Sequence, residues 1–131
     1  MIFTGIMERK NIITGVVLIA LFLMLGAYLE SQMGAGVLWK TSPRHGFWKM
    51  AHIHGIGFGI LNILYAFVFK SYAGQNKITN IGSSLCILGS FLPAGLFLAG
   101  IVPELMYMAP VGGLSMVSAW AVLAYSLLTK K

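Results

Sequence analysis

Acidic side chains are scarce in this sequence. Its 131 residues include three of them, Glu8, Glu30 and Glu104, and none lies in the middle of an apolar run. Acid–base hydrolysis needs positioned proton donors and acceptors, and carboxylates are among the commonest. The scarcity of carboxylates therefore excludes a hydrolytic constellation.

Cysteine occurs once, as Cys86 within an apolar run. A single cysteine excludes an internal disulfide and also the C-x-x-C-H attachment of a c-type haem. Any haem in this protein would therefore be held non-covalently.

Long polar stretches are missing as well. Hydrophobic residues make up 58% of the chain, charged residues 9%, and the mean hydropathy is +0.86. This composition is typical of a membrane protein and leaves no segment for a separate soluble domain. The formal net charge of +6 comes from nine lysines and arginines dispersed near the ends of apolar runs. We therefore expect the lipid bilayer as a partner and no binding of nucleic acid.

Four apolar runs predict an all-α, integral membrane four-helix bundle that forms a single domain over residues 1–131. The expected helices cover residues 11–29, 47–69, 79–102 and 110–128, and about 20 residues suffice to cross the ~30 Å hydrocarbon core. Ser42 and Pro43 are residue types that begin a helix, and Pro93 should kink the third one. The first run is longer than the ~7–15 apolar residues of a signal peptide, which favours a retained helix. Small residues on the third and fourth helices predict close helix contacts and a homo-oligomer.

The basic residues predict the orientation of the bundle. With the N-terminus inside, six fall on the inner side: Arg9, Lys10, Lys70, Lys77, Lys130 and Lys131. Three fall on the outer side: Lys40, Arg44 and Lys49. The positive-inside rule then favours an N-in, C-in arrangement, as expected of a multi-pass protein in a bacterial inner membrane.

The second apolar run carries the candidate site. It follows His45 and contains His52 and His54, the other two histidines of the chain. At about 100° per helical residue, one narrow face collects five side chains: Trp48, His52, Gly55, Gly59 and Asn62. His54 points about 200° away from His52, so the two imidazoles should not share one ion.

An imidazole within an apolar helix needs a partner, a metal or water. Neutral histidine is a common axial ligand of haem b, and Gly55 and Gly59 would leave room for a flat macrocycle beside His52. Lys49 and Arg44 lie where the two haem propionates would need cationic partners. We therefore predict that His52 binds the haem iron, with Trp48 at the same site and His54 as the alternative ligand.

Two other interpretations stay open. The glycines of the second helix could serve close helix packing in a non-enzymatic membrane or accessory protein. Alternatively, a histidine from this region could join Met106 and Met108 in a copper-handling membrane protein, although no Met-x-x-Met cluster is present.

Residues 47–52 (FWKMAH) and the glycine-rich continuation to Asn62 resemble the second helix of the styrene oxide isomerase family, which has a Trp-x-x-x-His segment with Ala before the His. The resemblance continues through residues 77–87 (KITNIGSSLCI), where the family has a Lys-Thr-containing turn and a Leu-Gly-Ser helix start. It covers about residues 46–98 of a chain with a similar four-helix plan.

This resemblance implies a trimer with haem b between subunits and His52 as its ligand. It also implies that the iron acts as a Lewis acid on the epoxide oxygen of a small hydrophobic substrate, which becomes an aldehyde. The polar residues that the family carries elsewhere align with Phe58, Leu88 and Leu96 here. Asn62, one turn beyond Phe58, is the candidate catalytic residue that could replace the missing Asn.

Overall fold

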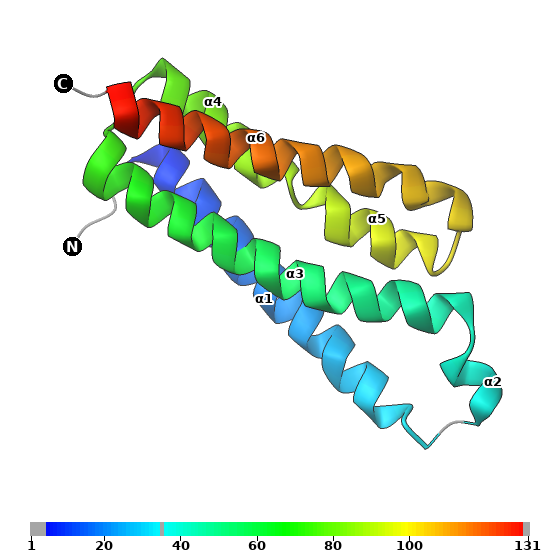
Figure 1. Cartoon of the computed structure of the whole chain (residues 1–131). Coiled ribbons are helices and arrows are strands. Elements are labelled where there is room, and N and C mark those ends of the chain that lie inside the picture. Colours follow the sequence, from blue (N-terminus) through cyan, green and yellow to red (C-terminus); the bar gives the residue numbers. More distant parts are fainter. Residues whose placement is uncertain (1–4, 35, 130–131) are drawn as a thin grey trace.

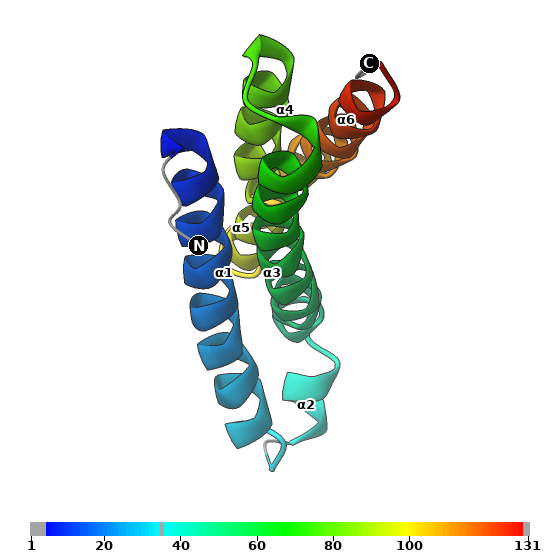
Figure 2. The same ribbon diagram turned by 90° about the vertical axis from the view of Figure 1, so that its left-hand side faces the viewer.

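The computed structural model of the chain describes residues 5–34 and 36–129. Every regular element in these ranges is helical, in the order α1 (Ile6–Ser31), α2 (Val37–Lys40), α3 (Pro43–Val68), η1 (Phe69–Ala73), α4 (Lys77–Leu88), α5 (Phe91–Ala99), η2 (Pro103–Tyr107) and α6 (Met108–Thr129). Helices α1 and α3 run side by side, while α6 lies along α4 and α5 (Figure 1). Seen from the end, α1 and α6 are on opposite sides of α3 (Figure 2).

Four helical segments are long and apolar enough to cross a membrane: Ile6–Ser31, Pro43–Ala73, Lys77–Ala99 and Pro103–Thr129. Large apolar side chains also cover the outside of the bundle; Leu114 and Val117 of α6, for example, are each 70% exposed. A helix that is apolar on its outer face is expected where lipid surrounds it. The predicted helical fold with four potential membrane spans is confirmed.

The start of α3 also agrees with the sequence analysis. Ser42 is the N-cap, because its hydroxyl oxygen accepts a hydrogen bond from the backbone N–H of His45 at 3.2 Å, and Pro43 is the first helical residue. Helix α3 therefore begins before residue 47, the expected limit of the second apolar helix.

The connection from α3 to α4 is short and tightly built. Helix α3 continues as the π-helical turn η1, and the chain then reverses at Gly74, whose φ of 75° suits glycine. Asn76 and Thr79 form a capping box: Asn76 accepts from the Thr79 N–H at 3.0 Å, and the Thr79 hydroxyl accepts from the Asn76 N–H at 2.9 Å. The two helices are antiparallel neighbours as a result.

The third apolar segment, predicted as one kinked helix over 79–102, is divided into α4 and α5 at Gly89 and Ser90. Pro93 explains the position of the break, since it has no N–H to donate to the carbonyl of Gly89 four residues earlier. That carbonyl accepts from the N–H of Leu92 at 3.0 Å instead. The α6 backbone approaches closely here, because a Cβ on Gly112 would collide with the backbone at Leu92. The segment also ends at Ala99, and η2 leads into α6 two residues before the predicted start.

Candidate functional site

His52 sits at the contact between α1 and α3. Its Nδ1 lies 2.6 Å from the carbonyl oxygen of Phe22 on α1. A carbonyl only accepts, so Nδ1 carries the proton of the neutral imidazole and Nε2 keeps its lone pair. A backbone partner of this kind is what usually orients a metal-binding histidine.

Two small residues of α1, Gly26 and Ala27, lie beside His52. The imidazole lies so close to Gly26 that a Cβ at this position would collide with the ring. A hollow of about 320 Å³ adjoins it, lined in the described part of the chain by six residues: Leu23, Gly26, Ala27, Glu30, His52 and Ile56. His52 therefore borders an open space, and its Nε2 lies close to Gly26.

The glycine face of α3 is covered by α1. A Cβ on Gly55 would collide with the ring of Phe22, and one on Gly59 would lie 2.7 Å from the carbonyl oxygen of Gly15. Within the chain, the space that we expected a macrocycle to occupy at Gly55 and Gly59 is filled by protein. These two glycines serve helix packing, as the alternative interpretation proposed.

Trp48 and Arg44 connect α3 to α5. The indole N–H of Trp48 donates to the carbonyl of Phe97 at 3.0 Å, and the two rings stack with centroids 5.6 Å apart. Arg44 donates through Nε to the carbonyl of Gly100 at 2.9 Å, and its guanidinium lies 5.6 Å from the centre of the Trp48 ring. Lys49 is exposed at the same end of α3. None of these three residues is among those that line the His52 hollow, so their predicted contacts with haem stay predictions.

His54 faces the other side of α3, as the helical spacing predicts. Its Nδ1 lies 2.9 Å from the carbonyl oxygen of Met50, one turn earlier. Two adjoining hollows of about 520 and 500 Å³ separate α3 from α6, and His54, Leu92 and Gly113 line both of them. The structure thus gives the two histidines separate environments.

Asn62 belongs to a buried polar cluster that joins α1, α3 and α4. Its Oδ1 accepts from the Asn11 amide at 3.2 Å, and its own amide donates to the carbonyls of Phe58 and Cys86 at 3.0 and 3.3 Å. Asn11 also bonds Ser83, through the Ser83 hydroxyl and its carbonyl. Asn62 is fully buried and hydrogen-bonded on both sides of its amide, so the structure gives it a role in packing, and its catalytic role stays a prediction.

Two buried polar residues of α1 were not predicted from the sequence: Asn11, which belongs to this cluster, and Glu8, which pairs with Lys70. Asn11 is 1% exposed and Glu8 is 7% exposed, and a Glu8 carboxylate oxygen lies 3.7 Å from the Lys70 ammonium. The signal was present, because Glu8, Asn11 and Gly15 recur at helical spacing and so share one face of α1. A polar residue on the same face as a tight glycine contact indicates a partner on the neighbouring helix.

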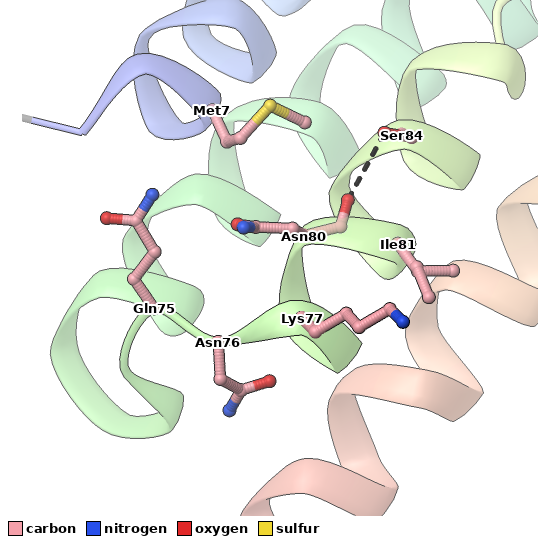
Figure 3. A pocket seen from close by; sticks show the side chains of 7 residues that line it. All are labelled: Met7, Gln75, Asn76, Lys77, Asn80, Ile81 and Ser84. Carbon is pink, nitrogen blue, oxygen red and sulfur yellow. Dashed lines mark hydrogen bonds between the residues drawn. The ribbon is translucent and has the colours of Figure 1, made fainter.

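Another hollow, of about 560 Å³, lies at the α3–α4 turn. Figure 3 shows its amide side chains, Gln75, Asn76 and Asn80, around the start of α4, with Met7 of α1 opposite. The Asn76 side chain is engaged as the helix cap, and the Ser84 hydroxyl donates to the backbone carbonyl of Asn80 at 3.2 Å. These bonds organise the turn and bring no titratable pair together.

The predicted copper ligands do not converge on one point. Met106 lines a hollow together with His54 and Met50, whereas Met108 packs against Gly95 of α5. Among the described residues, no group of three or more His, Cys, Asp or Glu side chains could hold a metal ion. The copper interpretation therefore stays a prediction that would depend on His54 and thioether sulfurs.

Comparison of the chain with protein-family models, with curated proteins and with solved structures found no match. The resemblance to the styrene oxide isomerase family therefore stays a prediction that depends on the quoted residues alone.

Proposed function

We propose that this chain is a multi-pass membrane protein that binds haem b non-covalently, with His52 as the axial ligand. The observation that supports this most is the 2.6 Å contact between His52 Nδ1 and the Phe22 carbonyl. It holds the imidazole in one tautomer and leaves Nε2 free beside the small residues Gly26 and Ala27. The resemblance of residues 47–52 to the isomerase family points to the same histidine.

The residues present suit a haem that is shared between copies of the chain. The hollow beside His52 holds about 320 Å³, which is near the lower end of the ~300–1,000 Å³ of ligand pockets. A macrocycle placed there would be covered on one side only, so a second copy would cover the rest. This favours a homo-oligomer, a trimer if the chain follows the resemblance, with the exposed Lys49 available to a propionate.

A haem bound at His52 would supply an iron centre able to act as a Lewis acid on the oxygen of a small hydrophobic epoxide. The chain's own contribution is to hold the ligand nitrogen and to fix the ring through the Phe22 carbonyl. We include isomerisation of an epoxide to an aldehyde in the proposal as its second part.

The proposal also includes an orientation with both ends inside a bacterial inner membrane. The start of α1 and the end of α6 lie at the same end of the bundle (Figure 1), as four crossings require. Arg9, Lys10, Lys70 and Lys77 are at that end by their place in the helices, and the excess of basic residues there favours the cytoplasmic side.

Absorbance of the purified protein tests the haem site. We expect protein expressed with ample haem to show a Soret band that His52→Ala removes and that added imidazole restores in this variant. His54→Ala is the matched control, two residues away on the opposite side of α3, and should keep the band. A wild-type protein without a Soret band, or equal loss in both variants, would contradict the haem site.

A separate assay tests the reaction. Haem-loaded protein should convert an aryl epoxide to the corresponding aldehyde, and His52→Ala should not. A haem-loaded protein that leaves the epoxide unchanged would remove the isomerase part and leave the haem site standing.

A further inference from the structure

The space between α3 and α6 is a second site, separate from His52. We name it the His54 groove and define it by the two adjoining hollows that share His54, Leu92 and Gly113. One hollow continues to Phe58 and Trp120, the other to Tyr107 at the end of η2. Helix α5 lies between α3 and α6 in this part of the bundle (Figure 1), so the floor of the groove is Leu92.

Two neighbouring glycines of α6, Gly112 and Gly113, differ in what they contact, and one of them keeps the groove open. A Cβ on Gly112 would collide with the backbone at Leu92, so this glycine permits helix contact. A Cβ on Gly113 would meet only the Cδ1 end of the Leu92 side chain, at 3.2 Å. Gly113 therefore keeps room above Leu92 without bringing two backbones together.

The polar groups that line this groove include the buried indole N–H of Trp120, which has no hydrogen-bond partner among the described residues, and the imidazole of His54. Its Nδ1 donates to the Met50 carbonyl at 2.9 Å, which leaves the Nε2 lone pair of the neutral imidazole as a hydrogen-bond acceptor. An acceptor without a partner is costly in an apolar surround. An occupant with a hydroxyl can donate to an imidazole nitrogen and accept from an indole N–H, whereas an acyl chain can do neither.

The other side chains that line the groove favour an aromatic ligand. The Phe58 ring meets His54 edge-on with centroids 6.2 Å apart, and Trp120 and Met116 line the same hollow. Aromatic rings and thioether sulfurs pack favourably against a flat aromatic body. Volumes of about 500 Å³ lie within the range of small-molecule pockets.

We propose that the His54 groove binds a small membrane-dissolved phenol, whose hydroxyl donates to Nε2 of His54 and whose ring lies against Phe58 over Leu92. This site is independent of the haem proposal, because it lies on the opposite side of α3 and uses none of the residues that line the His52 hollow.

Two naphthalenes of similar size test the proposal. The probe is 1-naphthol, and 1-methoxynaphthalene is the control that cannot donate a hydrogen bond. With ¹⁵N-histidine-labelled protein in nanodiscs, we expect 1-naphthol to shift the Nε2 resonance of His54 and to leave His52 unmoved. The naphthol should bind about three- to tenfold more tightly than the ether, as expected for one hydrogen bond in an apolar site.

Variants distinguish the contribution of the hydrogen bond to His54 from the contribution of the open groove. His54→Leu should lower the affinity for 1-naphthol to that for the ether and leave binding of the ether unchanged. Val117→Trp, at the groove, should abolish binding of both probes. Leu114→Trp is its matched control, because Leu114 has the same 70% exposure on α6 but does not line the groove, and it should bind both as before.

Three results would overturn the proposal. Equal affinity for the two probes would show that the groove accepts any apolar molecule, including a lipid chain. An unmoved Nε2 resonance in the wild type at saturating naphthol would exclude the hydrogen bond, even if the His54→Leu variant failed to fold. Binding of both probes that survives Val117→Trp would place them outside the groove. The Soret band of the same samples reports on haem separately, so either proposal can fail alone.

Discussion

Replacing Gly59 by alanine should destabilise the contact between α1 and α3. The new Cβ would lie 2.7 Å from both the Gly15 carbonyl oxygen and Cγ1 of Ile19, whereas ordinary contact begins near 3.4 Å. The helices would therefore have to separate by 3.4 − 2.7 = 0.7 Å, and one of the two obstacles is backbone that cannot rotate away. Overpacking of this kind typically costs about 1–3 kcal/mol.

Gly57→Ala is the matched control on the same helix. A Cβ at Gly57 would meet nothing within 4 Å. Both variants gain the same preference of alanine over glycine in a helix, about 1 kcal/mol, and this gain cancels when the two are compared. The free energy of unfolding of Gly59→Ala should therefore be about 1–3 kcal/mol lower than that of Gly57→Ala.

The assay is unfolding of the detergent-solubilised protein by SDS, followed by circular dichroism, with Soret absorbance as a second readout that tests the proposed haem site. We expect Gly59→Ala to be less stable than Gly57→Ala even in haem-free protein. If Gly59 instead formed a surface for the cofactor, Gly59→Ala would lose haem while the haem-free protein kept the stability of Gly57→Ala. That second result, or equal stability of the two variants throughout, would refute the packing argument.

Two further predictions concern the polar cluster and the orientation. Asn11→Leu removes the amide that donates to Asn62 Oδ1 at 3.2 Å and to the Ser83 carbonyl at 3.4 Å. The free energy of unfolding should fall by about 1–3 kcal/mol, because hydrogen bonds between membrane helices average ~0.6 kcal/mol and a buried oxygen loses its partner. Unchanged unfolding in SDS would contradict this. Single cysteines at Gly36, where a Cβ meets nothing within 4 Å, and at the exposed Gln75 should react with a membrane-impermeant maleimide from opposite sides. Labelling of both from one side of sealed vesicles would exclude the four-span arrangement.

Features that depend on local chemistry could be predicted from the sequence. The four apolar runs required four long helices, because length and hydropathy are properties of each segment alone. Ser42 and Pro43 began α3 as their residue types predict. The opposite directions of His52 and His54 followed from the helical period, which does not depend on neighbouring helices.

The tertiary structure alone determines which residues of the neighbouring helices contact each face of α3. Periodicity placed Gly55 and Gly59 on the His52 face, but only the packing of the helices shows that α1 fills that face. The same packing pairs Asn62 with Asn11 and brings the Phe22 carbonyl to His52. The small residues beside the His52 hollow are therefore Gly26 and Ala27 of α1, and not Gly55 and Gly59 of α3.

The His54 groove likewise depends on the tertiary structure, because its lining residues come from α3, α5 and α6 together. Pro93 predicts a kink in the third helical segment, but the direction of α5 after the break also depends on how α6 packs against it at Gly112. A residue's direction from its own helix axis is local information. The identity of what it meets depends on the relative placement of whole helices, which many weak contacts determine together.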